Sequence, residues 1–231
     1  MSDKKIKIMK NGPYIVTGNV PLSEKIVVPV GKHYEYEDGQ GFPQAETYAL
    51  CRCGKTKTPP FCDGTHTKIN FSGTEVASKD KFEDRLVRTV NGPELDLLDD
   101  GRCSLSRFCH RELGHAWNLT KQSDDPAKKK EAIIGASQCP SGRLVAVEKN
   151  GEVHEDKFEQ SIDILYDKEK GVIGPIYVKG GIPIESADGE VYEIRNRAAL
   201  CRCGHSDNKP FCDAMHLGRE EHDRIFNKDK K

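Results

Sequence analysis

Short alternations of apolar and polar residues, rather than long amphipathic stretches, characterise this chain of 231 residues. A period of two, typical of a strand, appears in SIDILYD at 161–167. Two apolar runs flank Asn150-Gly151 within GRLVAVEKNGEVHE at 142–155, which predicts a two-stranded hairpin. A hairpin turn at Asp-Gly followed by an alternating strand is predicted for DGEVYEIRN at 188–196.

Helical patterns are few and short. A helix is predicted within DDPAKKKEAIIGASQC at 124–139, where Asp125 can serve as N-cap and Pro126 fits the first helical position. Another short helix is predicted to open within DGRCSLSRFCHRELGHAW at 100–117. The pattern as a whole favours an α+β fold of small antiparallel β-structures with short helices.

An internal repeat organises the chain. The segment NGPYIVTGNVPL at 11–22 reappears as IGPIYVKGGIPI at 173–184. Each copy predicts a short strand, a Gly-marked turn and a second strand whose Pro suits a sheet edge. Each then leads into Ala-Leu-Cys-Arg-Cys-Gly. We therefore divide the chain into repeat one (1–75), a middle segment (76–170) and repeat two (171–231).

The two repeats differ in the length of the spacer before their cysteines. Gly12 precedes Cys51 by 39 positions, whereas Gly174 precedes Cys201 by only 27. We assign the additional residues of repeat one to PVGKHYEYEDGQGF at 29–42, whose glycines and charges predict a loop.

Composition narrows the function classes. Charged residues make up 32% of the chain against 35% apolar residues, so small domains stabilised by bound metal are expected rather than one large core. The net charge of −1 leaves no basic footprint for nucleic acid. No apolar run approaches membrane-spanning length, and the N-terminus shows no secretory signal, so we expect a cytoplasmic protein that binds no membrane. In that reducing compartment, nine cysteines favour metal ligands over disulfides.

Both repeats carry Cys-x-Cys-x8-Cys-x3-His. Thiolate and imidazole ligands suit iron–sulfur clusters, zinc or copper(I). The close Cys pair can hold one iron of a two-iron cluster, while the later Cys and His hold the other. Three Cys and one His also form a legitimate structural zinc set, although Cys-x-Cys is tighter than the usual zinc spacing. The candidate ligands are Cys51, Cys53, Cys62 and His66 in repeat one, and Cys201, Cys203, Cys212 and His216 in repeat two.

These residues resemble the CDGSH iron–sulfur domain family, whose pattern is Cys-x-Cys-x2-Ser/Thr-x3-Pro-x-Cys-Asp-Gly-Ser/Ala/Thr-His. Repeat two departs from it at Ala214 and Met215, and a left-handed backbone at the Gly position makes Ala214 costly. The resemblance implies a [2Fe-2S] cluster in each repeat, held by three Cys and one His. It also implies that the repeats pack through a swapped β-structure as a pseudo-dimer. Repeat one matches throughout, at Cys51, Cys53, Thr56, Pro60, Cys62, Asp63, Gly64, Thr65 and His66.

An aspartate follows the third cysteine in each repeat. Asp63 and Asp213 are expected to cap backbone donors, to orient the turn that presents the histidine, or to do both.

The middle segment holds three further cysteines, Cys103, Cys109 and Cys139. Bacterial ferredoxins carry Cys-x2-Cys-x2-Cys and a remote Cys-Pro. Without the middle cysteine of the triplet, this pattern becomes the Cys-x5-Cys and remote Cys-Pro of the present chain, and Ser106 stands at the position of the missing cysteine. The segment resembles the divergent single-cluster [4Fe-4S] domain, which implies a third cluster of [3Fe-4S] or [4Fe-4S] type. Ser106, His110 and His115 are the alternatives for a fourth ligand. Buried thiols without a metal are the other interpretation.

The sequence thus predicts an iron–sulfur protein that acts as an electron carrier or cluster donor. Its partner is expected to be a redox protein or an apo-protein acceptor. No P-loop, nucleophile elbow or dinucleotide fingerprint indicates a catalyst, and an enzyme that uses the clusters as an internal wire is a lesser alternative. A zinc-stabilised structural or interaction module is the main alternative.

Overall fold

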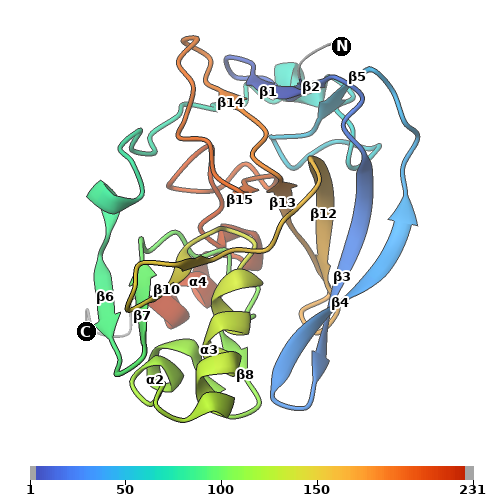
Figure 1. The fold of residues 1–231 in the computed structure, drawn as a ribbon. Helices are drawn as coiled ribbons and strands as arrows, with labels where there is room; N and C mark the ends of the chain where they lie inside the picture. The colour runs from blue at the N-terminus through green and yellow to red at the C-terminus, as the bar shows by residue number, and fades with distance from the viewer. Residues whose placement is uncertain (1–3, 227–231) are drawn as a thin grey trace.

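Four small β-sheets and a few short helices make up the computed structural model, which describes residues 4–226 (Figure 1). The first sheet has the order β14 (Ile184–Glu185), β1 (Lys5–Ile8), β2 (Tyr14–Thr17) and β5 (Thr47–Leu50). The second has the order β15 (Arg197–Leu200), β13 (Val172–Lys179), β12 (Ser161–Asp167), β3 (Leu22–Val30) and β4 (His33–Gly41).

The middle segment forms the other two sheets. One has the order β11 (Val153–His154), β10 (Leu144–Glu148), β7 (Leu95–Asp99) and β6 (Arg88–Asn91), and the other pairs β8 (His110–Arg111) with β9 (Gly114–His115). The helical elements are α1 (Thr65–Lys68), η1 (Glu83–Arg85), α2 (Ala116–Thr120), α3 (Pro126–Ser137), η2 (Met215–Leu217) and α4 (Arg219–Phe226).

The two repeats pair their strands in the same register. In repeat one β2 pairs with β5 so that Tyr14 faces Leu50, and in repeat two β13 pairs with β15 so that Ile176 faces Leu200. On the other side, β1 lies antiparallel to β2 as β12 lies antiparallel to β13. The segment at 161–167 is therefore a strand, as its alternation predicts, and it stands in the sheet of repeat two.

Repeat one contributes two strands, β3 and β4, to the sheet of repeat two, and repeat two contributes one strand, β14, to the sheet of repeat one. β3 of repeat one runs parallel to β12, with Leu22 opposite Ile162, and β14 of repeat two runs parallel to β1, with Ile184 opposite Ile6. One buried apolar cluster joins both sheets and includes all four of these side chains. Burying such a side chain is worth about 1.5–3 kcal/mol, so the exchange of strands ties the two repeats into one unit.

The middle segment has its own small core, in which α2 and α3 cover the sheet of β7 and β10. The prediction for α3 is confirmed: Pro126 begins the helix, and the Asp125 carboxylate accepts the Ala127 amide at 2.9 Å as its N-cap. The hairpin around Asn150-Gly151 is also confirmed, since β10 and β11 pair there.

One local prediction was wrong, and two were confirmed only in part. The segment at 29–42 is not a loop but the turn and second strand of the β3–β4 hairpin, because Tyr36 stacks on Phe108 at 4.2 Å and anchors β4 to the middle segment. The segment at 188–196 forms only a single bridge between Val191 and Glu185 instead of a strand. Residues 100–109 are irregular, and the helix expected within 100–117 begins only at Ala116.

The expected α+β class is confirmed by these small sheets and short helices. The second strand of each repeat was expected at a sheet edge. In repeat two this strand, β14, lies at an edge, whereas in repeat one β3 lies between β12 and β4. Among residues 4–226 we find no helix of sufficient length and apolarity to traverse a lipid bilayer.

Candidate metal centres

The strand that precedes each Cys-x-Cys segment fixes the first and third cysteines. In repeat one the Cys51 amide donates to the Pro60 carbonyl at 2.8 Å, and the Cys62 amide donates to the Ala49 carbonyl at 2.9 Å. In repeat two the equivalent bonds of Cys201 and Cys212 are both 2.8 Å long, to the carbonyls of Pro210 and Ala199 respectively. The loop between the cysteines therefore folds back beside the strand end, which places the first and third cysteines of each repeat side by side.

A hydroxyl closes this loop from inside. The Thr56 hydroxyl donates to the Phe61 carbonyl at 2.7 Å, and the Ser206 hydroxyl donates to the Phe211 carbonyl at the same distance. Each hydroxyl also accepts the amide two residues later, from Thr58 in repeat one. A Ser or Thr is thus required here because only a short hydroxyl can bond both sides of the loop.

The aspartate after the third cysteine ties this loop to the turn that presents the histidine. The Asp63 carboxylate accepts the Lys57 amide at 2.8 Å and the Thr65 amide at 2.9 Å, and these bonds hold its pKa well below the usual value. Asp213 accepts the equivalent amides of Asp207 and Met215 at 2.7 Å and 3.2 Å. Both roles expected of the aspartates, binding backbone donors and orienting the histidine turn, are therefore observed.

The ligand candidates of each repeat lie in two pairs. In site one, which we define as Cys51, Cys53, Cys62 and His66, the Cys51 and Cys53 sulfurs are 3.8 Å apart, and Cys62 Sγ lies 3.3 Å from His66 Nδ1. In site two, defined as Cys201, Cys203, Cys212 and His216, the corresponding distances are 3.7 Å and 3.5 Å.

These distances fit one metal per pair. Two thiolates at about 2.3 Å from a tetrahedral metal lie about 3.8 Å apart, and a thiolate with an imidazole nitrogen lies about 3.6 Å apart. Within residues 4–226, no three His, Cys, Asp or Glu side chains are grouped closely enough to hold a single ion. The donor sets fit two metals held by two ligands each, which is the arrangement of a [2Fe-2S] cluster, and Cys51, Cys53, Cys62 and His66 in site one and their equivalents in site two would hold it.

In site two, His216 and Cys201 readily take the protonation states in which such side chains bind metal. Burial lowers the pKa of His216 to about 4, so its imidazole is neutral at pH 7. The hydrogen bond between Cys201 and Cys203 lowers the pKa of Cys201 to about 6 and raises that of Cys203, and burial raises that of Cys212, so Cys201 is the thiol that ionises readily without metal. A neutral imidazole and a readily formed thiolate are the forms in which these side chains bind metal.

The histidine turn begins with a left-handed residue in both repeats. Gly64 has φ of 82° before α1, and Ala214 has φ of 74° before η2. The cost expected for Ala214 is thus present in the structure, since its Cβ disfavours this backbone region. Site two nevertheless keeps the same ligand geometry as site one.

The two sites lie back to back. A Cβ placed on Gly54 would meet the carbonyl carbon of Cys203 at 2.8 Å, and one on Gly204 would meet the carbonyl oxygen of Cys53 at the same distance. The Tyr14 hydroxyl of repeat one also donates to the Cys201 carbonyl at 2.8 Å. Glycine is therefore needed after each Cys-x-Cys pair so that the backbones of the two sites can touch.

Two arginines beside the ligands were missed by the sequence analysis. Arg52 and Arg202 stand between the cysteines of each Cys-x-Cys pair. Arg52 is buried and donates to the carbonyls of Met9 and Gly73. The Nε atom of Arg202 is buried without an acceptor among the described residues. Only the identical Arg in both repeats could have drawn attention to them in the sequence.

The middle site is defined as Cys103, Cys109 and Cys139. Burial and the charges of the two other cysteines raise the pKa of Cys109. The loop between Cys103 and Cys109 carries positive φ at Leu105 (54°) and Arg107 (64°), and the Leu105 amide donates to the Cys103 sulfur at 3.4 Å. Backbone amides turned inward in this way form the concave nests that bind anionic iron–sulfur groups. Three thiols around such a loop fit a cluster held by Cys103, Cys109 and Cys139.

The alternatives for a fourth ligand lie in different surroundings. Ser106 is buried, with its hydroxyl 3.1 Å from that of Ser104. His110 and His115 face each other across β8 and β9, with ring centroids 4.3 Å apart. Each of the three is therefore already in contact with another polar side chain, and a fourth ligand stays a prediction.

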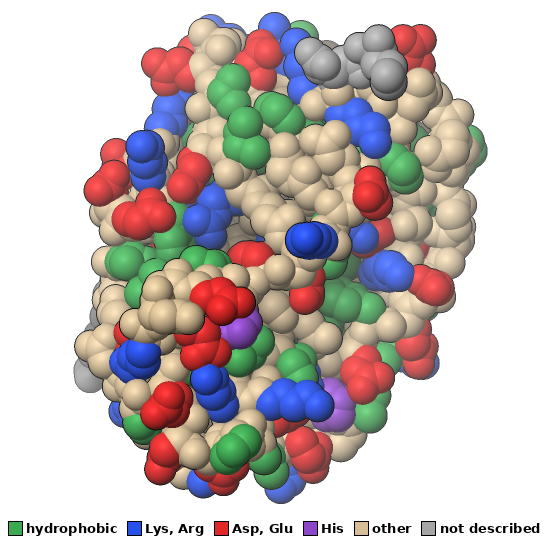
Figure 2. Space-filling model, in the orientation of Figure 1, with side chains coloured by type: hydrophobic (Ala, Val, Ile, Leu, Met, Phe, Trp, Pro, Cys, Tyr) green, Lys and Arg blue, Asp and Glu red, His purple; other side chains and the backbone are tan. Residues whose placement is uncertain are grey.

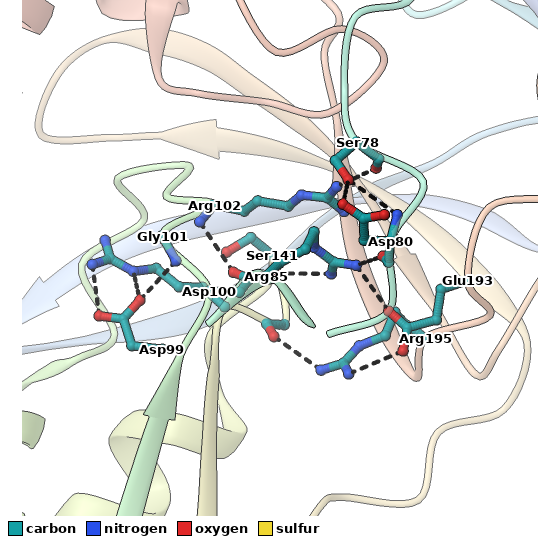
Figure 3. A network of polar contacts seen from close by, with 12 residues as sticks. Ser78, Asp80, Arg85, Asp99, Asp100, Gly101, Arg102, Ser141, Glu193 and Arg195 are labelled. Carbon is teal, nitrogen blue, oxygen red and sulfur yellow. Dashed lines mark hydrogen bonds and ion pairs between the residues drawn. The ribbon is translucent and has the colours of Figure 1, made fainter. Parts of the chain in front are cut away.

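Ion pairs and hydrogen bonds hold the backbone just before Cys103, at residues 99–102. Figure 3 shows Arg85 between Asp100 and Glu193, at 3.0 Å and 3.2 Å, and Arg102 bonded to the Ser78 carbonyl. Beside it, Arg143 binds both oxygens of Asp99 at 2.6 Å and 2.8 Å.

The middle site adjoins site two. The Arg102 guanidinium covers the Phe211 ring at 4.2 Å, next to Cys212. Arg197, which is 1% exposed, donates at 2.7 Å to the carbonyls of Ala136 and Cys139. Site two thus lies between site one and the middle site.

Comparison with known protein families gives two matches. Residues 11–67 and 173–217 match the family described as the iron-binding zinc finger of CDGSH type. Residues 90–149 match the family described as the divergent 4Fe-4S mono-cluster. No curated protein and no solved structure gave a significant match. The family matches cover all eleven candidate cysteine and histidine ligands. They confirm the expected layout, in which two CDGSH-type iron-binding segments flank a divergent 4Fe-4S segment. Together these matches support iron–sulfur cluster binding.

Proposed function

We propose that the chain is a one-electron carrier that holds a [2Fe-2S] cluster at each of sites one and two and a [3Fe-4S] or [4Fe-4S] cluster at the middle site. The observation that carries this proposal is the division of each site into two ligand pairs with one-metal spacing. When bound, such clusters accept and release single electrons. The chain's own residues supply the ligands and exclude water from them.

The packing of the three sites supports a carrier. The first cysteine of each site is nearly inaccessible, since Cys51 and Cys201 are each 1% exposed. Because the loops of sites one and two touch and site two adjoins the middle site, the three centres form a contiguous series. Rigid, buried ligands change little between redox states, which suits reversible electron transfer. The electron donor and acceptor would be redox proteins of a reducing compartment such as the cytoplasm.

Cluster donation to an apo-protein is a second candidate, and one observation favours it for site one. Cys62 of site one is partly exposed, whereas the equivalent Cys212 of site two is buried; His66 and His216 are both partly exposed. An accessible Cys–His pair lets a proton or an incoming thiol reach the metal, and protonation of histidine weakens its bond to metal. Site one is thus the centre from which a cluster would leave.

The test is to purify the full chain without oxygen and to measure iron, sulfide and zinc per chain together with the visible spectrum. About four iron and four sulfide would support two [2Fe-2S] clusters, and about seven or eight iron would add the middle cluster. Zinc without sulfide or visible absorption would contradict the proposal and would support the zinc-stabilised module.

Carrier and donor are separated by a second measurement. A carrier should be reduced by dithionite and reoxidised through several cycles with its sulfide content unchanged. A donor should lose site-one sulfide when an apo-ferredoxin is added, and Cys62→Ala protein, which lacks site one, serves as the control.

A further inference from the structure

Exposed lysines surround the ligand loop of site one. Within residues 51–72 the exposed charged side chains are Asp63 and three lysines, Lys55, Lys57 and Lys68, which we define as the site-one rim. The Asp63 carboxylate already accepts two backbone amides. None of the three lysine side chains forms an ion pair or a side-chain hydrogen bond with another described residue. The site-one rim therefore presents its positive charges to solvent.

The backbone of the site-one rim is held beside the accessible ligand pair. The Lys57 amide donates at 2.8 Å to the carboxylate of Asp63, the residue that follows Cys62. Lys68 ends α1, the helix that carries His66. Cys62 and His66 are both partly exposed. A protein bound to the rim would thus stand close to the exposed end of site one.

The equivalent positions of repeat two lack this charge. The common spacing of the repeats places His205, Asp207 and Gly218 where repeat one has its three lysines. Asp207 pairs with Arg219 at 2.8 Å, so opposite charges beside site two are matched. The excess of positive charge thus distinguishes site one from site two, although the net charge of the whole chain is −1.

The size of the rim favours a protein partner over a larger polyanion. Anionic lipid surfaces are bound by clusters of about four to eight basic residues. Three lysines on a chain with a negative net charge fall short of such a cluster. They suit an electron-transfer complex, whose contact is small and whose partners are brought together by complementary charge.

We infer that the site-one rim is the docking surface for a redox protein that carries its cofactor beneath an acidic patch. This inference rests on the proposed function, because it takes site one as the centre that exchanges electrons with the partner. When a reduced partner docks, one electron passes to site one, the partner's cofactor is oxidised, and no bond forms or breaks. Attraction between the rim and the acidic patch raises the association rate, and a small contact lets the partner leave after transfer.

The experiment measures how fast a reduced acidic protein passes its electron to the full cluster-bearing chain. The probe is a plant-type ferredoxin, an acidic [2Fe-2S] protein whose reduction potential lies below that of a [2Fe-2S] cluster with imidazole ligands. Its oxidation is followed by stopped-flow absorbance with wild-type protein and with the triple variant Lys55→Glu, Lys57→Glu and Lys68→Glu. Iron and sulfide analysis confirms that both proteins carry their clusters.

We expect the triple variant to lower the second-order rate constant about tenfold or more at low salt. The difference should disappear near 1 M salt, because the Debye length falls from about 30 Å at 0.01 M to about 3 Å at 1 M. A rate constant that does not respond to reversal of the rim would overturn the inference. Where the glutamate variant fails to load, the same test with glutamine at the three positions decides, and a smaller decrease is expected.

A matched control makes the same change of net charge far from site one. Lys121, Lys130 and Lys157 of the middle segment are exposed and form no ion pair with another described residue. Lys121 follows α2 and Lys130 lies in α3, which Figure 1 places at the opposite end of the molecule from β5, the strand before Cys51. Lys121→Glu, Lys130→Glu and Lys157→Glu together should keep the wild-type rate. An equal decrease in this control would contradict a localised docking surface.

Cross-linking supplies a readout that needs no electron transfer. A carbodiimide joins carboxylates of oxidised ferredoxin to lysine amines where the two proteins touch, and peptide mapping identifies those lysines. We expect cross-links at the site-one rim. Cross-links confined to other lysines would refute the inference.

A second probe separates a protein partner from a membrane surface. Vesicles of phosphatidylcholine and phosphatidylserine should not bind the chain at physiological salt. Vesicle binding that is lost in the rim variant, without any effect of the rim on ferredoxin, would overturn the inference in favour of an anionic lipid surface. Absence of sulfide from wild-type protein would instead refute the proposed function, so the two failures are distinguishable.

Discussion

The contact between the two sites can be tested by adding one methyl group at Gly54. This glycine belongs to repeat one, yet a Cβ on it would lie 2.8 Å from the carbonyl carbon of Cys203 and closer still to the carbonyl oxygen. Both atoms belong to backbone, which cannot rotate away as a side chain can. Gly54→Ala should therefore push the Cys203 backbone and disturb site two from the other repeat.

Gly64→Ala is the matched control for backbone strain. Gly54 and Gly64 both have left-handed backbone, with φ of 71° and 82°, but nothing lies within 4 Å of a Cβ on Gly64. A left-handed alanine costs about 1–2 kcal/mol, and the smaller entropy of unfolded alanine returns about 0.4–1 kcal/mol. Gly64→Ala should thus cost about 1 kcal/mol. Gly54→Ala adds the overpacking term of about 1–3 kcal/mol and should cost about 2–4 kcal/mol.

Two assays check this reasoning. Urea unfolding of the metal-free variants gives the difference in stability, which we expect to be about 2 kcal/mol. Iron and sulfide analysis should show that Gly54→Ala loses cluster from both sites, whereas Gly64→Ala affects site one alone. Equal stability of the two variants, or full retention of the site-two cluster in Gly54→Ala, would refute the back-to-back packing.

Four further predictions concern single residues. Cys53→Ser should remove the site-one cluster and leave the site-two spectrum, and loss of all colour would show instead that the clusters load as one cooperative unit. His66→Cys should keep a cluster with a lower reduction potential and a weaker pH dependence of cluster loss, because thiolate adds negative charge and removes the protonatable imidazole; an unchanged pH dependence would exclude His66 as a ligand. Burial lowers the pKa of His216 to about 4. As the pH falls, this histidine is therefore protonated first in the unfolded chain, near pH 6.5. Metal-free protein should thus lose stability as the pH falls from about 6.5 to about 4. Urea midpoints at pH 7 and pH 5 measure this loss, which should diminish in His216→Asn. Asp125→Ala should cost about 1 kcal/mol in urea unfolding, since it removes the N-cap of α3, and a neutral effect would argue against the cap.

The parts of the molecule that could be predicted from the sequence are those with local causes. Asp125 and Pro126 define the start of α3 because a cap and a fixed φ act within one turn. Asn150-Gly151 likewise defines a hairpin, and the spacing of the cysteines and histidine brought the ligand pairs together as expected.

Elements with distant causes were missed. The charged strand β4 looked like a loop, because its partner for burial, Phe108 on Tyr36, lies in another segment. The exchange of β3 and β14 between sheets pairs Leu22 with Ile162 and Ile6 with Ile184. A swapped β-structure was expected only from the resemblance to the CDGSH family, because no local signal specifies pairing over such separations. The contacts of Arg52 could not be predicted for the same reason, since its acceptors, the carbonyls of Met9 and Gly73, lie far from it in the sequence.

The divergence of the repeats has a consequence for how the middle segment acts on them. Position 47 of repeat one corresponds in register to Arg197 of repeat two, because Thr47 pairs with Thr17 as Arg197 pairs with Lys179. Thr47 is exposed, whereas Arg197 is buried and bonded to the Cys139 carbonyl. Among the described residues, repeat one shows no equivalent of this bond, so it is the strand before Cys201 that is bonded directly to a residue of the middle site. The duplicated motif thus has unequal surroundings, because the strand before Cys201 is bonded to the middle site whereas the strand before Cys51 is exposed at the equivalent position.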